Sequence, residues 1–388
     1  MMNASTLERA VARLFCAGFQ GLAVPAELAE LQARGITGAI LFRRNVESPA
    51  QVAALNAELE ERAGRPFLVS VDQEGGRVMR LREPCTALPP MRDLGAADDP
   101  ALARRMGAVL GRELRALGFD LDFAPVLDVD TNPDNPVIGD RSFGRDAERV
   151  AALGAAAIRG LQEAGVAACG KHFPGHGDTS QDSHEELPRL PHDPARLEAV
   201  ELPPFRAAIE AGVASIMTAH VIFEALDPLH PATMSRPALD GILRDRMGFG
   251  GVVISDDLEM KAIADHFGIE EAVVRGMNAG VDLFLVCHTP AVQHEAIDRL
   301  IAAVERGDVP MARVEEAGRR IDALVARYVR PKSRHPDLSV LGCDEHRAVA
   351  DAIAAAAGRA AGAPGADPTE LARGTVNPAS RRSSGPGA

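Results

Sequence analysis

The chain has 388 residues, of which 46% are hydrophobic and 25% charged, a composition typical of a globular protein with a sizeable core. Its 55 acidic and 42 basic residues give a net charge of −13, which argues against non-specific nucleic-acid binding because such binding needs Lys and Arg contacts to phosphates. No apolar run of about 18 residues, the length that would span a membrane, occurs in the chain. The first residues are polar and lack the apolar region of a signal peptide. We therefore expect a cytoplasmic protein without nucleic-acid or membrane partners.

Eight short apolar runs that end at polar residues follow one another along the chain. Near-continuous hydrophobicity over this length is typical of strands that are buried on both faces. The predicted strands are residues 14–17, 38–42, 66–72, 120–127, 166–171, 214–218, 251–255 and 281–287.

Helical patterns fill the gaps between these runs. Residues 25–35 begin with proline and end with glycine, and residues 48–64 repeat this arrangement, with Ser48 as the expected N-cap and Pro49 as the first helical residue. Eight such units predict an α/β fold with a single (β/α)8 barrel of the TIM type. A doubly wound open sheet competes, but no glycine-rich dinucleotide turn follows the first strand. The remaining predicted helices are residues 100–117, 147–164, 195–211, 269–279 and 291–307.

The end of the chain differs in composition from the rest. We assign residues 1–335 to the catalytic barrel and residues 336–362 to a C-terminal helical extension, with a helix expected over 344–361. From residue 363 to 388, Ala, Gly, Pro, Ser and Arg dominate, which predicts a disordered tail.

The five cysteines are scattered and form no C-x-x-C pair. We expect buried, reduced thiols. A catalytic cysteine is the alternative.

Polar residues stand at the ends of most of the predicted strands. In a (β/α)8 barrel the active site gathers at the carboxyl ends of the strands. Each of these residues could instead cap the helix that follows it. The strand-end residues are Asp72, Asp128, His172, His220, Asp256 and His288.

The densest group of such residues is the loop after the fifth strand, Lys-His-Phe-Pro-Gly-His-Gly-Asp from residue 171, followed by Asp-Ser-His from residue 182. One interpretation is a polar loop with incidental histidines. Another is a zinc site on its three histidines, although H-x3-H-x7-H is not an established zinc spacing. A third is a general acid/base, because Asp182 can orient the imidazole of His184 and raise its basicity.

Three further groups could complete such a site. Asp256, at the end of the seventh strand, is placed to act as a nucleophile, whereas Asp257 suits an N-cap better. The segment from Asp72 to Arg80 combines carboxylates with arginines that could bind sugar hydroxyls. Arg141, in the loop after the fourth strand, either binds ligand or pairs with its neighbour Asp140 on the surface.

Together these motifs resemble the glycoside hydrolase family 3 β-N-acetylglucosaminidases, most closely the short type, from about residue 10 to residue 330. The resemblance implies that Asp256 is the catalytic nucleophile, His184 the acid/base and Asp182 its orienting partner. It implies no metal and no cofactor. The residues implied to hold the N-acetylglucosamine unit are Asp72, Arg80, Arg141, Lys171 and His172.

The function implied is that of a retaining exo-β-N-acetylglucosaminidase acting through a covalent glycosyl-aspartate. Its expected substrate is a small carbohydrate, the N-acetylglucosaminyl muropeptide of cell-wall recycling, and the expected state is a monomer. The alternatives are a family 3 β-glucosidase, whose acid/base usually comes from a second domain, a non-catalytic sugar-binding barrel, and a metal-dependent hydrolase.

Overall fold

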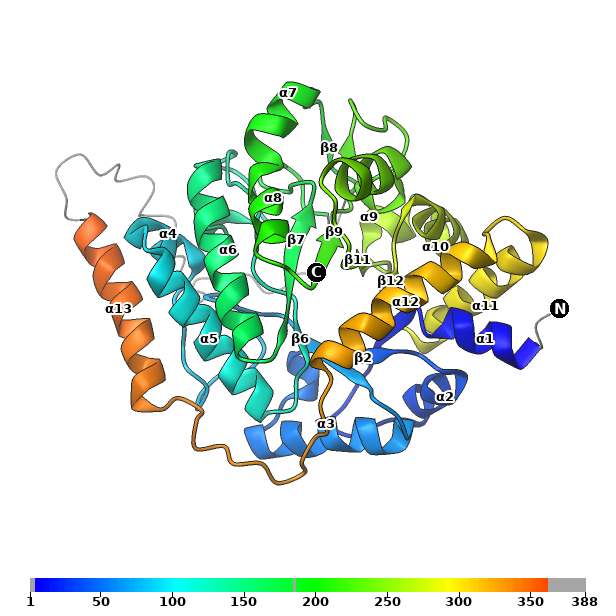
Figure 1. Cartoon of the computed structure of the whole chain (residues 1–388), viewed down its shortest axis with the longest axis horizontal. Coiled ribbons are helices and arrows are strands. Elements are labelled where there is room, and N and C mark those ends of the chain that lie inside the picture. Colours follow the sequence, from blue (N-terminus) through cyan, green and yellow to red (C-terminus); the bar gives the residue numbers. More distant parts are fainter. Residues whose placement is uncertain (1–3, 184–185, 362–388) are drawn as a thin grey trace, which may run out of the picture.

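The computed structural model describes residues 4–183 and 186–361, and its central feature is a closed barrel of eight parallel strands (Figure 1). Around the barrel the order is β1-β12-β11-β9-β7-β6-β3-β2, and β2 pairs with β1 to close it. Every predicted apolar run overlaps one of these strands, so the (β/α)8 barrel is confirmed and the open sheet was the wrong alternative. The strands are β1 (Phe15–Gly18), β2 (Gly38–Leu41), β3 (Leu68–Val71), β6 (Leu121–Asp122), β7 (Ala167–Phe173), β9 (Ser215–Thr218), β11 (Val252–Asp257) and β12 (Leu283–Val286).

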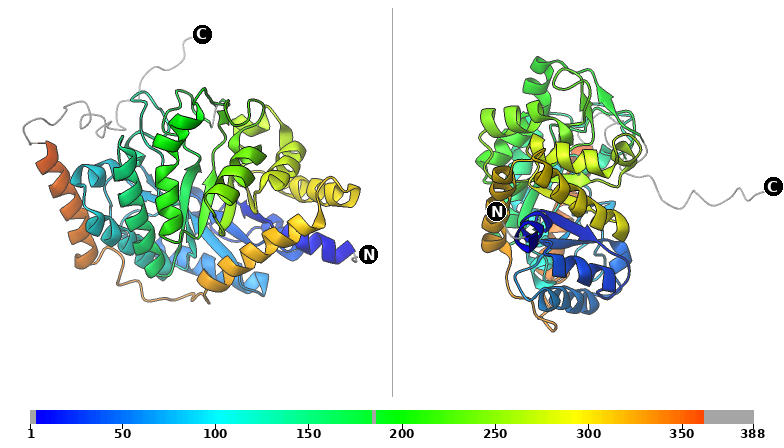
Figure 2. Two further views of the ribbon diagram at one scale, coloured as in Figure 1. Left: turned by 45° about the horizontal axis from the view of Figure 1, so that its top comes forward. Right: turned by 90° about the vertical axis from the view of Figure 1, so that its right-hand side faces the viewer.

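Helices surround the strands on the outside, as both views of Figure 2 show. The Ser48 hydroxyl accepts a hydrogen bond from the Gln51 backbone N–H at 3.2 Å, which confirms the predicted cap, and Gly64 ends that helix with φ 63°. The long helices are α1 (Ala4–Ala12), α2 (Ala26–Arg34), α3 (Pro49–Ala63), α5 (Pro100–Ala116), α6 (Ala147–Glu163), α8 (Pro203–Glu210), α10 (Gly268–Ala279), α11 (Pro290–Arg306), α12 (Met311–Tyr328) and α13 (Asp344–Ala361).

One predicted helix is interrupted. Residues 195–211 do not form a single helix, because Pro203 and Pro204 have no backbone N–H to donate. The segment is instead divided into α7 (Pro194–Arg196), a π-helical turn (Leu197–Glu201) and α8. Short elements that we did not predict are α4 (Met91–Ala97), α9 (Lys261–Ala264), a π-helical segment (Pro237–Arg246), and the strand pairs β4 (Gln73–Gly75) with β5 (Val78–Met79) and β8 (Arg189–Leu190) with β10 (Ile222–Phe223).

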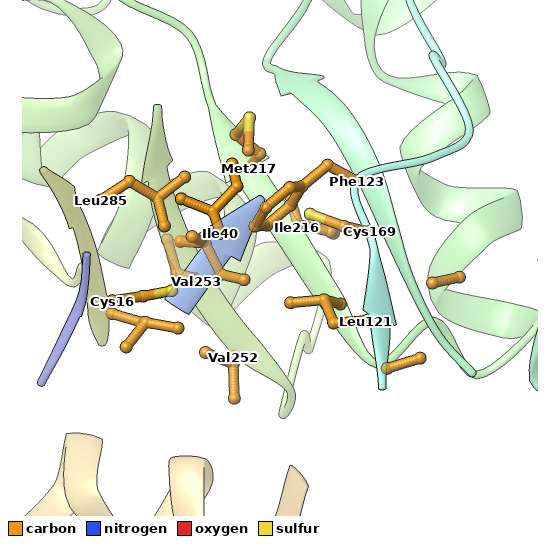
Figure 3. Packing of buried hydrophobic residues seen from close by; sticks show 14 of the residues in the cluster. Cys16, Ile40, Leu121, Phe123, Cys169, Ile216, Met217, Val252, Val253 and Leu285 are labelled. Atoms are coloured by element: carbon orange, nitrogen blue, oxygen red, sulfur yellow. The ribbon is translucent and has the colours of Figure 1, made fainter. Parts of the chain in front are cut away.

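The barrel interior is filled with apolar side chains from different strands, as Figure 3 shows for Cys16, Ile216, Val253 and their neighbours. The side chains labelled there are at most 3% exposed, so the barrel is a packed core and not a pore. Two of the cysteines, Cys16 and Cys169, belong to this core, and burial raises the pKa of each thiol to about 12. The predicted buried thiols are confirmed for four of the five cysteines; Cys343 is half-buried, and all five are free.

The predicted C-terminal helix is present as α13, which packs against α4 and α5 at one edge of the molecule (Figure 1). Buried Glu113 of α5 joins this region to the barrel: its carboxylate accepts bonds from Thr86, Gly342 and the His346 ring at 2.6–2.9 Å. The domain boundary at residue 335 stays a prediction, and the expected tail from 363 lies outside the described residues. No helix within 4–183 and 186–361 is long and apolar enough to cross a membrane.

Candidate active site

A cavity of about 480 Å³ opens at the carboxyl ends of the barrel strands. Its floor is the outer layer of the barrel core, formed by Ile40, Phe123, Met217 and Leu285 (Figure 3). Of the eight site residues predicted from the sequence, all but His184 line this cavity; His184 lies outside the described residues. Those that line it are Asp72, Arg80, Arg141, Lys171, His172, Asp182 and Asp256.

One side of the cavity carries five charged groups, Asp72, Glu74, Arg80, Arg141 and Lys171, called here the ion cluster. The Lys171 ammonium lies 2.8 Å from Asp72 Oδ1 and 2.6 Å from Glu74 Oε1. Arg141 donates two parallel bonds to Glu74, at 2.7 and 2.8 Å, and Arg80 Nη2 lies 3.2 Å from Asp72 Oδ2. The correct partner of Arg141 is therefore Glu74, and the alternative pairing with Asp140 was wrong: Asp140 binds Arg77.

The ion cluster holds its charges firmly. Burial alone would raise the carboxyl pKa values, but Lys171 and Arg80 hold the pKa of Asp72 below its usual value, and Arg141 and Lys171 hold that of Glu74 well below. Burial would likewise lower the pKa of Lys171, yet the two carboxylates raise it. A fixed carboxylate accepts from hydroxyl groups and a fixed ammonium donates to them, which suits the binding of a sugar.

His172, at the end of β7, is oriented by a buried carboxylate. Its Nδ1 lies 2.7 Å from Asp128 Oδ2, and Asp128 Oδ1 accepts bonds from the backbone N–H groups of His172 (3.1 Å) and His176 (2.7 Å). Burial opposes ionisation of Asp128, but His172 and His176 bring its pKa below the usual value. Of the strand-end residues, Asp128 therefore lies behind the cavity wall and fixes the ring that faces the ligand space.

Asp256 stands at the end of β11 in a half-buried position on the cavity wall. Its Oδ1 accepts the backbone N–H of Asp257 at 2.8 Å. The Asp257 backbone is supported in turn by His220, whose Nε2 lies 3.0 Å from the Asp257 carbonyl oxygen. His220 is thus a second strand-end residue that lies behind the wall and supports a neighbour.

The expected capping role of Asp257 was wrong. The next helix, α9, starts only at Lys261, and the Asp257 carboxylate accepts the backbone N–H groups of Cys287 (3.1 Å) and Glu259 (3.2 Å) instead. It also lies 3.1 Å from His288 Nε2, and this hydrogen bond raises the pKa of His288. Asp257 therefore links the end of β11 to the end of β12.

Residues 174–183, called here the histidine loop, continue directly from β7, the strand that carries Lys171 and His172. His176 is 2% exposed, with Nε2 2.9 Å from Ser183 Oγ and Nδ1 2.9 Å from Thr179 Oγ1. Burial lowers the pKa of His176 to about 4. Within the described part of the chain no three His, Cys, Asp or Glu side chains gather as metal ligands would, and both ring nitrogens of His176 already contact hydroxyl groups.

Sequence reasoning missed Glu74, although a signal was present. Residues two apart in an extended segment point to the same side, so Asp72 and Glu74 share one face beside β4. The contact of His176 with Ser183 and that of His172 with Asp128 had no such signal, since they join residues that the loop folds or the barrel brings together.

Comparison with known proteins identifies the family. Residues 6–324 match the glycosyl hydrolase family 3 N-terminal domain. A β-hexosaminidase of Thiobacillus denitrificans is 47% identical over 271 residues, which cover 68% of this chain and 75% of that protein. One of Nitrosomonas eutropha is 43% identical over 288 residues, covering 72% and 81%.

Solved structures agree with these sequence relatives. The family 3 β-N-acetylglucosaminidase of Paenibacillus sp. superposes with a TM-score of 0.87 at 44% identity, covering 92% of this chain and 69% of that one. NagZ of Neisseria gonorrhoeae, in complex with N-trifluoroacetyl-D-glucosamine, superposes with a TM-score of 0.75 at 35% identity, covering 89% and 98%. The chain therefore belongs to glycosyl hydrolase family 3 and is a glycoside hydrolase of the β-hexosaminidase type.

Proposed function

We propose that this protein is a retaining exo-β-N-acetylglucosaminidase that removes terminal N-acetylglucosamine from small carbohydrates. The observation that carries the proposal is the placement of Asp256 and Asp182 on the wall of the same cavity as the ion cluster. A carboxylate nucleophile, an acid/base partner and a polyhydroxyl-binding cluster are the parts that this reaction needs. The NagZ relative bound an N-acylated glucosamine, which supports the choice of sugar.

The reaction we infer is a double displacement. The Asp256 carboxylate attacks the anomeric carbon while His184, held by Asp182, gives a proton to the glycosidic oxygen, and the bond to the leaving alcohol breaks. His184 then takes a proton from a water molecule, which attacks the same carbon and releases the Asp256 carboxylate. Two inversions at one carbon leave the β configuration of the sugar unchanged.

A histidine in place of the usual second carboxylate has a physical rationale. Two carboxylates side by side raise one another's pKa, because ionisation of both is costly. A neutral imidazole adds no negative charge next to Asp256, so each group can keep the protonation state that its step needs. Direct attack by Asp256 also distinguishes this route from one in which the 2-acetamido group attacks its own anomeric carbon.

A mechanism-based 2-fluoro sugar inactivator tests the nucleophile. Peptide mass mapping of the inactivated enzyme should find the label on Asp256. Label on any other residue, or the absence of any covalent adduct on an enzyme that turns over the N-acetyl substrate, would contradict the double displacement.

The sugar specificity is tested by comparing 4-nitrophenyl β-N-acetylglucosaminide with the corresponding β-glucoside. We expect the N-acetyl substrate to be strongly preferred in kcat/KM. A preference for the glucoside would make the family 3 β-glucosidase the correct alternative, and binding without turnover would favour the sugar-binding barrel. A loss of activity with chelators would favour the metal-dependent hydrolase.

We further propose that the natural substrate is an N-acetylglucosaminyl muropeptide of cell-wall recycling and that the protein works as a cytoplasmic monomer. A panel of muropeptides and chitin oligosaccharides on purified protein tests the substrate: turnover of chitin oligosaccharides only would contradict it. Sedimentation equilibrium tests the oligomeric state.

A further inference from the structure

The histidine loop is tied to the barrel through a chain of buried contacts that none of the proposed catalytic roles uses. The chain starts at Asp128, whose Oδ1 accepts the His176 backbone N–H at 2.7 Å. The His176 ring then contacts Thr179 Oγ1 and Ser183 Oγ, each at 2.9 Å. Both His176 and Ser183 are 2% exposed, so these contacts are shielded from water.

The loop around His176 is fixed from a second side. Asn135 Nδ2 donates to the His176 carbonyl oxygen at 2.9 Å and to Thr179 Oγ1 at 3.3 Å. Asn132 Nδ2 donates to the Thr179 carbonyl oxygen at 3.1 Å. The loop after β6 therefore braces the loop after β7, and the His176 ring extends this bracing to Ser183.

The position of Ser183 gives this tie a consequence for catalysis. Ser183 stands between Asp182 and His184 in the sequence, and its neighbour Asp182 lines the active-site cavity. A buried hydrogen bond at Ser183 restrains the backbone directly after Asp182, the described member of the proposed acid/base pair. Small misalignments at a reacting centre lower the reaction rate, because proton transfer needs the donor within hydrogen-bond reach.

We propose that His176 and Ser183 are positioning residues that align the proton-transfer pair of Asp182 and His184 with the glycosidic oxygen. This inference rests on the proposed function of that pair. The His176 ring acts as a cross-link and transfers no proton itself, since both of its nitrogens are already engaged with hydroxyl groups. Ser183 Oγ lies 2.9 Å from His176 Nε2, and the proposed reaction assigns it no bond-making or proton-transfer step.

The test is Ser183→Ala, which removes one hydroxyl and leaves the His176 ring in place. Two substrates are compared: 2,4-dinitrophenyl β-N-acetylglucosaminide, whose leaving group needs little protonation, and chitobiose, whose leaving group needs full protonation. Misalignment of the acid should lower kcat for chitobiose by about 10- to 100-fold. For the dinitrophenyl substrate kcat should fall by less than about threefold, and KM should change little for either substrate.

A matched control is Ser215→Ala. Ser215 is equally buried, and its hydroxyl donates to the Ala168 carbonyl oxygen at 3.1 Å, but it lies in β9 below the cavity. Loss of this hydroxyl tests the general cost of removing a buried hydrogen bond. It should change kcat for the two substrates by the same factor. A second loop variant, Thr179→Val, removes the hydroxyl at the other imidazole nitrogen and should repeat the selective loss if Ser183→Ala unfolds.

Equal losses on both substrates in a folded Ser183→Ala enzyme, or no loss, would overturn the positioning role. His184→Ala, measured in parallel, separates this failure from failure of the proposed function. If His184→Ala shows the selective loss on chitobiose and Ser183→Ala does not, only the positioning role falls. If His184→Ala itself loses both substrates equally, the acid/base assignment falls and the inference falls with it.

Discussion

The two halves of the active-site cavity are held together by different forces. The ion cluster uses five ionised side chains, and its carboxyl pKa values are held low while that of Lys171 is raised. The histidine loop is cross-linked by the ring of His176, which contacts two hydroxyl groups and whose pKa is lowered to about 4. The half proposed to bind sugar thus keeps constant charge over the working pH range, whereas the half proposed to move protons is built on a neutral frame, the uncharged ring of His176. Binding and turnover should therefore respond separately to mutation.

The substitution expected to separate turnover from binding most strongly is Asp256→Ala. Removal of the proposed nucleophile should lower kcat by on the order of 10⁴-fold, because no other group on the cavity wall is proposed to attack the anomeric carbon. The affinity for N-acetylglucosamine, measured by calorimetry, should change little since the ion cluster is untouched. Substantial remaining turnover would exclude the nucleophile role, and lost binding would show that the two halves are not separable.

Glu74→Gln should have the opposite effect and weaken binding more than turnover. Loss of this charge leaves Lys171 and Arg141 without a shared buried partner, and breaking a buried pair costs about 3–5 kcal/mol of stability. Because the two cations also face the ligand, the KM and the Kd for N-acetylglucosamine should rise more than kcat falls. Unfolding and calorimetry measure the two effects.

A matched control for Glu74 is Glu163→Gln. Glu163 binds Arg104 through two bonds of 2.7 and 2.9 Å, nearly the geometry of the Arg141 pair, but both side chains are more than half exposed. An exposed pair of this kind contributes about 1 kcal/mol or less. A similar loss of stability from both variants would mean that burial of the ion cluster is not what makes Glu74 important.

The sequence was most informative where local pattern and local structure coincide. The eight strands could be predicted because each is buried on both faces and therefore reads as a continuous apolar run. The helix predicted over 195–211 was wrong where Pro203 and Pro204 interrupt the bonding, although the prolines were visible. Asp257 was misassigned because β11 continues to this residue, so that its carboxylate turns toward β12 and not toward the following helix.

For the site, the sequence supplied the residues but not their partners. The pairing of Arg141 with Glu74 spans 67 positions, and that of His172 with Asp128 spans 44. Nothing in residue spacing specifies such contacts, since they depend on which strands become neighbours and how their loops fold back. Family resemblance named the groups proposed to touch the sugar, whereas the buried residues behind them became visible only in three dimensions.

The neutral frame of the histidine loop predicts a specific acid sensitivity. The pKa of His176 is about 4 in the folded protein against about 6.5 when unfolded, so below pH 6.5 the unfolded state binds the extra proton. Stability should then decrease as the pH falls from about 6.5 to about 4, by up to about 3 kcal/mol from this group. The low carboxyl pKa values of Asp72 and Glu74 contribute stability that is lost only below about pH 4.

Urea unfolding of wild type and His176→Gln between pH 4 and 7 measures this contribution. Buried His220, whose pKa burial also lowers, gives both proteins some acid sensitivity, so the difference between the two curves is the informative quantity. That difference should shrink as the pH falls from 6.5 to 4. A constant difference would show that His176 does not titrate with a lowered pKa, and the contrast with the ion cluster would be lost.

The smallest expected effect comes from Asp128→Asn, which tests whether the two halves are joined. Asp128 orients His172 on the side proposed to bind sugar and accepts the His176 backbone N–H on the loop side. An amide keeps one acceptor but presents N–H groups to backbone donors that need acceptors, so at least one of these contacts should be lost. We expect a roughly 10-fold rise in KM, about 1.4 kcal/mol, together with a larger loss on chitobiose than on the dinitrophenyl substrate.

Asp99→Asn is the matched control for this last variant. The Asp99 carboxylate also accepts two backbone N–H groups, those of Ala101 (2.8 Å) and Leu102 (3.1 Å), but it caps α5 on the surface. Its replacement should leave KM and the leaving-group dependence unchanged, because asparagine is an equally good N-cap. If Asp128→Asn raises KM without any selective loss on chitobiose, Asp128 serves only the sugar-binding half. The loop would then be aligned independently, through Asn132 and Asn135, and the two halves of the cavity would be mechanically separate as well as chemically different.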